Sequence, residues 1–254
     1  MGPEPGVPGP RRWGPAAVVD GVPSPVRALS SHRMIGPDHA LIDGFPYPDD
    51  PGASAAARAE HLQQAEALLR RGIEITDATA ERTDAGVVLS VTVTSLTDGH
   101  RVPTGVTAER QLWLAVTATS AGGERVYASG DLDADGNLRD DHSAAVCSGA
   151  VEPDVDLFNL QSTHWGPGQE EGDCGVPFSF EATTIQRNSL MPREARVVTY
   201  ALPNEADTVE VTLRYRSMPP YILQVLGLEA LTERLHVFTV DHRQMVVGEK
   251  TKLK

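Results

Sequence analysis

A histidine in a tight loop is the first residue of this sequence that could carry chemistry. Residues 99–105, GHRVPTG, place His100 between glycines and a proline, directly after a predicted strand. Such a loop holds an imidazole in one place, which suits a haem ligand, a metal ligand or a proton carrier. A structural histidine that bonds to neighbouring backbone and shapes the turn fits the same pattern. Both interpretations stay open on the sequence alone.

Three aspartates form the second candidate site. Asp131, Asp133 and Asp135 stand before Gly136 with the spacing of calcium ligands at positions 1, 3 and 5 of an EF-hand loop. Position 12 is His142 instead of the bidentate glutamate, and no flanking helices are predicted. An acidic hairpin turn is the alternative, because Asp-Gly is a favoured turn pair. We therefore expect calcium binding here to be weak or absent.

The two cysteines, Cys147 and Cys174, lie in the same long loop. Oxidised, they would close that loop and stabilise the fold by about 3–4 kcal/mol in the chain-entropy model. Neither belongs to a C-x-x-C pair, which disfavours zinc and thioredoxin chemistry. Two unrelated thiols, or one nucleophile with His142 or His164 as its base, are the alternatives. In an exported protein we expect a disulfide.

No other motif in the sequence makes a self-contained site. The eight histidines include no H-E-x-x-H and no H-x-H, and G-x-S-x-G, P-loop and dinucleotide fingerprints are absent. The paired carboxylates Asp140-Asp141 and Glu170-Glu171 are interpreted as solvated turns. The histidines are His32, His39, His61, His100, His142, His164, His236 and His242.

The elements that must position these residues are mostly strands. Alternating apolar and polar residues predict five strands joined by loops, which indicates a mainly β fold, an antiparallel Ig-like β-sandwich. The predicted strands cover 87–93, 112–118, 125–129, 196–202 and 209–215. One helix is predicted over 54–71, with Ser54 as N-cap, and a closing helix over 221–235. A loop as long as 131–181 is usually either functional or held in place by a cross-link such as a disulfide.

Composition divides the chain into an arm and a domain. Residues 1–52 are irregular and rich in Pro and Gly, so we expect an extended arm that packs on a partner, followed by a sandwich domain over 53–254. The net charge of -13 argues against nucleic acid as a partner. No run approaches the ~20 apolar residues of a transmembrane segment. No signal peptide is visible, so the protein is either cytoplasmic or begins upstream of this sequence.

Several short segments, taken together, resemble the C-terminal portion of periplasmic multihaem cytochromes c of the cytochrome c-552/c-554-like group. Their order and spacing match from about residue 30 to about residue 245. The segments are SHRMIG at 31–36, GHRVPTG at 99–105, RQLWL at 110–114, DLFNLQS at 156–162, and LRYR at 213–216 before PP at 219–220.

The resemblance implies an electron-transfer context. In such proteins a region with several C-x-x-C-H haem sites comes first, and a β-rich domain follows. The family supplies distal imidazoles to haem iron from the H-R-x-x-G segment, which carries over to His32, with His39 and His100 as lesser candidates. This chain contains no C-x-x-C-H, so any haem c would belong to a partner or an upstream region. The arm at 1–52 would then wrap that haem domain in the periplasm.

Three hypotheses for function follow. The leading one is a haem-free accessory domain of a multihaem cytochrome c system, which covers haems, donates distal histidines and has no catalytic activity of its own. The alternative is an exported acidic β-sandwich that binds a protein or glycan, with calcium at the aspartate loop. The third is a hydrolase or thiol enzyme that uses Cys147 or Cys174.

Overall fold

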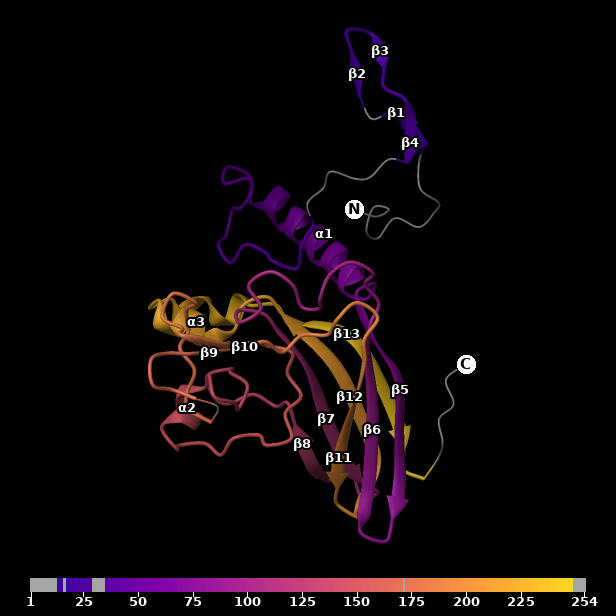
Figure 1. The fold of residues 1–254 in the computed structure, drawn as a ribbon, viewed down its shortest axis with the longest axis vertical. Helices are drawn as coiled ribbons and strands as arrows, with labels where there is room; N and C mark the ends of the chain where they lie inside the picture. The colour runs from indigo at the N-terminus through magenta and orange to yellow at the C-terminus, as the bar shows by residue number, and fades with distance from the viewer. Residues whose placement is uncertain (1–12, 16, 29–34, 171, 249–254) are drawn as a thin grey trace. The chain divides into compact units, whose positions relative to one another are not determined.

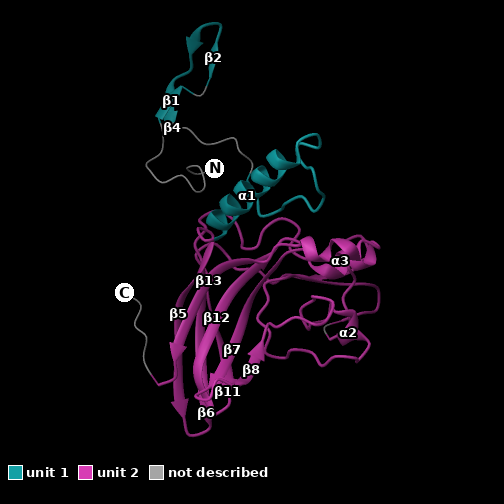
Figure 2. Ribbon diagram, turned by 180° about the vertical axis from the view of Figure 1, so that it is seen from behind, with its two compact units in different colours: residues 1–69 teal, residues 70–254 magenta. Residues whose placement is uncertain are grey.

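The structure is a computed structural model that describes residues 13–15, 17–28, 35–170 and 172–248. The chain divides into two compact units, residues 1–69 and 70–254, which Figure 2 draws in teal and magenta. The boundary between the units falls after Leu69, so the predicted helix lies in the same unit as the arm. The composition of the sequence predicts this boundary after residue 52 and so assigns the helix to the sandwich domain. None of the helices in the described part of the chain is long and apolar enough to cross a membrane.

The arm contains a short β-ladder. Its turn is Asp20-Gly21, with φ of 50° and 79°, and this pair of positive φ values suits the right-handed twist of a two-stranded ribbon. Antiparallel pairing joins β1 to β4 and β2 to β3. The strands are β1 (Trp13–Pro15), β2 (Val18–Val19), β3 (Val22–Pro23) and β4 (Val26–Ala28).

The first unit ends with the helix α1, Pro51–Leu69. The predicted N-cap was wrong, because Asp50 fills that position: its Oδ1 accepts the backbone N–H of Ala53 at 2.9 Å. Proline then stands at the first helical position, where its missing N–H costs nothing. Ser54 is buried and instead donates its hydroxyl to the carbonyl of Tyr47 at 2.9 Å, which ties the preceding loop to the helix.

The second unit is an antiparallel β-sandwich, so the predicted fold class is confirmed (Figure 1). One sheet has three strands in the order β11-β6-β5 and the other has four in the order β13-β12-β7-β8. The first sheet comprises β5 (Ile73–Thr83), β6 (Gly86–Ser95) and β11 (Ala195–Leu202). The second comprises β7 (Gln111–Ser120), β8 (Arg125–Ser129), β12 (Ala206–Arg216) and β13 (Phe238–Val246).

Alternating apolar residues on both sheets make the core. These positions are at most 5% exposed, which is what the period-2 pattern of strands predicts for the buried face. Among them are Ile73, Ile75, Val87, Leu89, Val91, Val93, Leu112, Leu114, Val116, Val209, Val211, Leu213, Phe238 and Val240.

Two strands, β5 and β13, were not predicted, and they meet at one edge of the sandwich. The backbone N–H of Ile75 donates to Asp241 Oδ2 at 2.9 Å, and Arg243 Nη2 donates to the Ile75 carbonyl at 2.7 Å. A register shift between Ile75 and Asp77 interrupts the alternation of β5. That bulge hides the strand from a period-2 search.

The start of β7 is buried on both faces. The short strand β8 pairs only with the second half of β7. Along the first half, the chain around Asn159 takes the place of β8 beside β7. Leu160 donates its N–H to the Leu112 carbonyl at 2.8 Å, and Leu114 donates to the Phe158 carbonyl at 3.1 Å. Trp113 therefore lies fully buried on the face opposite the sandwich core, and its Nε1 donates to the Gly130 carbonyl at 3.1 Å.

The long loop and the chain after β12 form a lobe at one end of the sandwich (Figure 1). The closing helix predicted over 221–235 was wrong as one element, because Gly227, with φ of 68°, interrupts it. The lobe contains α2 (Ala144–Cys147), β9 (Thr163–Trp165), β10 (Thr184–Gln186), α3 (Pro220–Val225) and a 3-10 helix, η1 (Glu229–Arg234).

Candidate functional site

The lobe contains a cavity of about 390 Å³ that is open to solvent on one side. One wall comes from the loop before α2, a second from the chain after Cys174, and the third from α3. The residues that line it include Asp141, His142, Cys147, Gly175, Tyr221 and Val225. A concave site with a few converging polar groups is the usual place for a ligand.

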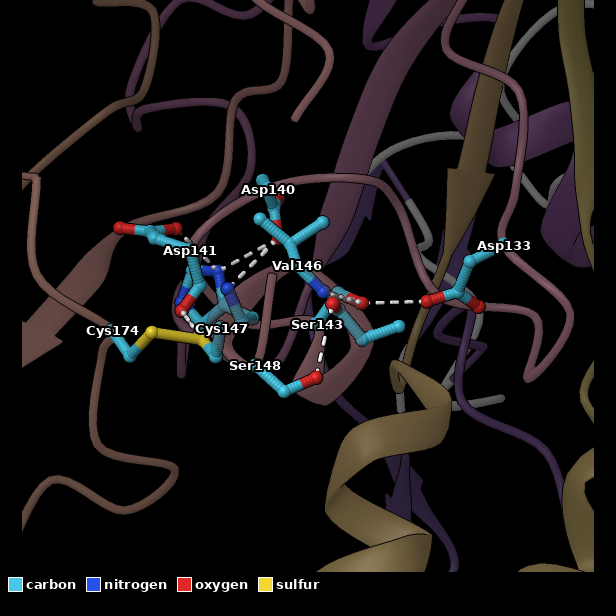
Figure 3. Close-up of a disulfide and its surroundings, with 10 residues drawn as sticks. Asp133, Asp140, Asp141, Ser143, Val146, Cys147, Ser148 and Cys174 are labelled. Carbon is cyan, nitrogen blue, oxygen red and sulfur yellow. Dashed lines mark hydrogen bonds and ion pairs between the residues drawn. A yellow bond between two sulfur atoms is a disulfide. The ribbon is translucent and has the colours of Figure 1, made fainter. Parts of the chain in front are cut away.

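His142 is the polar centre of this cavity. Its Nδ1 lies 3.3 Å from Asp140 Oδ1 and 3.0 Å from Asp141 Oδ1, and its side chain is 4% exposed. Burial by itself would lower the pKa of His142, but the hydrogen bonds and charges of the two carboxylates raise it to about 10. In this arrangement His142 is an imidazolium held between two carboxylates, whose positions Figure 3 shows.

Tyr221 holds the His142 ring from the side of α3. The two rings stack with centroids 5.1 Å apart and an interplanar angle of 16°. Tyr221 Oη donates to the Ala108 carbonyl at 3.0 Å and accepts from Gln161 Nε2 at 2.9 Å, while its backbone N–H donates to Asn137 Oδ1 at 2.8 Å. Burial raises the pKa of the Tyr221 phenol, so it stays neutral. The stacking partner is therefore fixed at both ends.

The predicted calcium loop positions the same site without forming a ligand cage. Asp133 Oδ1 accepts the backbone N–H groups of Asp135 at 3.0 Å and Asn137 at 2.8 Å. Its Oδ2 accepts the Ser143 hydroxyl at 2.6 Å, and Figure 3 shows this bond beside the first turn of α2. Asp131 pairs with Arg139 at 2.6 Å. Asp133 and Asp131 therefore bond to other groups of the protein.

The predicted disulfide is confirmed. Cys147 and Cys174 are joined, with their Cα atoms 5.9 Å apart, inside the ~7 Å that a bridge requires (Figure 3). The bridge links the end of α2 to the opposite wall of the cavity. Both sulfurs are bonded to each other and not free as thiols, so the thiol-enzyme hypothesis lacks its nucleophile in this structure.

The histidines proposed as haem ligands lie elsewhere. His32 is outside the described residues. His39 lines a separate hollow of about 290 Å³ in the first unit, together with Phe45 and His61. His100 is exposed in the second unit, and its Nδ1 lies 3.0 Å from the Arg101 carbonyl. His39 and His100 therefore belong to different units.

Sequence reasoning missed the centre of the cavity. Asp140 and Asp141 were interpreted as a solvated turn, and His142 was considered only as position 12 of the calcium loop and as a possible base for a cysteine. Their side chains are 17%, 27% and 4% exposed, so the turn is largely buried. The available signal was the run Asp140-Asp141-His142 in the loop that carries both cysteines. Nothing in the sequence indicates that Tyr221 packs against it.

Comparisons with known proteins give a likeness of fold. No family model and no curated protein matches the chain. A solved structure, the penta-heme cytochrome c552 from Thermochromatium tepidum, is similar with a TM-score of 0.50 and 22% sequence identity. The match covers 71% of this chain and 41% of that chain, so this protein spans less than half the length of the cytochrome.

Proposed function

We propose that this chain is a haem-free accessory domain of a multihaem cytochrome c electron-transfer system. It lies over haems carried by a haem-bearing region or subunit and donates distal imidazoles to them. The observation that carries the proposal is the fold shared with a penta-heme cytochrome c552 over 71% of this chain. The short motifs of the sequence, in the order found in such cytochromes, support it independently.

His100 has the geometry of an imidazole prepared for a ligand role. When Nδ1 carries the proton and donates it to the Arg101 carbonyl, Nε2 keeps its lone pair. The carbonyl of His100 accepts the Thr97 hydroxyl at 2.6 Å, and the next part of the loop pairs with Leu190. A neutral imidazole on a fixed backbone, with its second nitrogen hydrogen-bonded, is the form that metal-ligating histidines take.

His32 and His39 are the ligands proposed in the arm. His39 is half-buried at a hollow whose lining includes Ile42 and Phe45, which offers an apolar surface beside an imidazole. Low-spin c-type haem takes a second axial ligand of this kind and is stabilised by apolar surroundings. In the proposal, the arm packs on the haem-bearing region and brings His32 and His39 to iron.

The disulfide supports an exported location. Disulfides form and persist in oxidising compartments and are rare in the cytosol. Because Cys147 and Cys174 are joined, the structure fits a protein that works in the periplasm, where multihaem cytochromes c mature.

Co-purification tests the accessory role. The full chain would be expressed in a periplasm that matures c-type haem, together with the C-x-x-C-H-rich reading frame that adjoins it in the genome. We expect the chain expressed alone to be colourless. When the two proteins are expressed together, the chain should co-elute with the haem protein in size-exclusion chromatography, and the Soret band of the haem protein should shift. The absence of such a neighbouring frame, or separate elution with unchanged spectra, would contradict the proposal.

A further inference from the structure

Several buried polar atoms without hydrogen-bond partners fall in one short stretch of the lobe. In the described part of the chain, three such atoms fall in the stretch 159–165: Asn159 Oδ1, His164 Nδ1 and Trp165 Nε1. His164 is 6% exposed, so its Nδ1 has little access to solvent. A buried polar atom with no partner calls for an explanation by water or an ion, because its desolvation is otherwise uncompensated.

This stretch lies against the carboxylate pair. Asn159 Nδ2 donates to Asp140 Oδ2 at 3.4 Å. Gly175 lies between the backbone of His164 and the ring of His142: a Cβ there would lie 3.2 Å from the His164 carbonyl oxygen and 3.5 Å from His142 Cδ2.

Two carboxylates and one imidazole converge at this point. Asp140 Oδ1 and Asp141 Oδ1 lie 3.3 Å and 3.0 Å from His142 Nδ1, and the side chain of His142 is 4% exposed. The ligand atoms Nδ1 of His142 and one carboxylate oxygen each of Asp140 and Asp141 lie within 4.8 Å of one another, close enough to share one ion.

We propose that Asp140, Asp141 and His142 bind a divalent first-row transition ion of the zinc class. An imidazole together with carboxylates suits zinc and its neighbours, whereas calcium takes a shell made only of oxygens. Because His142 and Asp141 line the 390 Å³ cavity, an ion bound there would be accessible from it. This proposal is independent of the haem proposal and concerns a different site.

Metal titration of the full, untagged chain tests the proposal. Zn²⁺ would be titrated by calorimetry with a competing chelator, and Co²⁺ by its visible absorption, which reports the ligand geometry. The test variants are Asp141→Asn and His142→Gln. Matched controls are Asp84→Asn and His242→Gln, which change an exposed carboxylate and an exposed imidazole in other elements. Near-UV circular dichroism would verify that each variant folds, and Asp141→Asn decides alone if His142→Gln does not.

We expect one Zn²⁺ per chain at this site. Each test variant should weaken binding at least about tenfold, and the controls should stay within about twofold of the wild type. The same variants should abolish the Co²⁺ absorption. Three outcomes overturn the proposal: no Zn²⁺ binding at 100 µM, equal binding by test and control variants, or tighter binding of Ca²⁺ than of Zn²⁺. Because no haem protein is present, these results leave the electron-transfer proposal untouched.

Discussion

Glu194 sits at the start of β11 and illustrates how single charges stabilise the loops between strands. Its Oε2 accepts the backbone N–H of Met191 at 2.6 Å, and its Oε1 accepts Arg196 Nη2 at 2.9 Å. The backbone hydrogen bond first, and Arg196 second, hold the pKa of this carboxyl below its usual range. Both contacts require the ionised carboxylate.

The pH dependence follows from that direction. A carboxyl whose pKa is lowered by folding stabilises the protein above its unfolded pKa, and the contribution is lost as pH falls through the folded pKa. Because the side chain is 29% exposed, we expect Glu194→Gln to cost only about 0.5 kcal/mol at pH 7 and less than that at pH 2.5. Urea unfolding at both pH values checks this. An equal cost at both would show that the charge is not responsible.

Gly130 is the residue where β8 ends and the backbone passes closest to β7. Its φ is 72°, and a Cβ would lie 2.1 Å from the Leu114 carbonyl oxygen and 3.0 Å from Ala115 Cα. Its own carbonyl accepts Trp113 Nε1, and its N–H donates to Asp154 Oδ2 at 2.6 Å. No side chain fits without moving the β7 backbone.

Replacing Gly130 by Ala should therefore destabilise the sandwich by about 3 kcal/mol or more, since both strands must separate to admit the methyl group. The matched control is Gly123→Ala, where φ is 83° but nothing lies within 4 Å of the added Cβ. That variant should cost only the left-handed strain, about 1 kcal/mol. Chemical denaturation of both variants measures the difference, and equal costs would contradict the close approach.

At the scale of elements, the disulfide connects two walls of the cavity in the lobe covalently. It joins the end of α2 to the chain beside Gly175, whose N–H donates to the Asp141 carbonyl at 3.0 Å. Its removal frees a loop that spans a sequence separation of 27 in the unfolded chain. The chain-entropy model gives a stabilisation of about 3.5 kcal/mol for such a loop.

We expect the double variant Cys147→Ser/Cys174→Ser to unfold at a lower urea concentration, with a loss of about 2–4 kcal/mol. The oxidised and fully reduced wild type provide the comparison, and reduction should reproduce the loss seen in the variant. The intrinsic fluorescence of Trp165, which is buried in the lobe, reports the transition. Unchanged stability on reduction would mean that hydrogen bonds alone hold the loop.

Most strands with regular alternation were predictable from the sequence. The five predicted strands lie within β6, β7, β8, β11 and β12, and β8 was predicted although its register with β7 shifts. The two strands that were missed also contain irregularities: the register of β5 shifts between Ile75 and Asp77, and β13 shifts where it passes Leu213 and Arg214. Such a shift weakens the period-2 signal of a strand.

The disulfide was the part of the candidate site that the sequence could predict, because two cysteines in one loop are enough to indicate it. A pair of cysteines in one loop identifies a disulfide, and that prediction was correct. The ring of His142 packs against Tyr221, which lies about 80 positions away in the chain. A contact between residues so far apart leaves no pattern in the local sequence. The carboxylates that pair with His142 were therefore interpreted as a solvated turn.

At the scale of the whole molecule, charge constrains the partner. The net charge of -13 repels other acidic proteins and favours association with a basic or neutral face. A haem-bearing region that accepts this chain should therefore bind it more weakly as ionic strength rises, if long-range charge contributes to docking. The spectroscopy of the joined proteins is therefore best carried out at low salt.

The central claim is that this chain supplies axial ligands to haems outside it. Electron paramagnetic resonance of the chain joined to the proposed haem-bearing partner tests this most directly. The test variants are His32→Ala, His39→Ala and His100→Ala, and His242→Ala is the control on β13. We predict that removing a ligand converts one haem from low spin to high spin, with His32→Ala the first expectation, while His242→Ala changes nothing. If every haem stays low-spin in all three test variants, the chain donates no ligand and the account is contradicted.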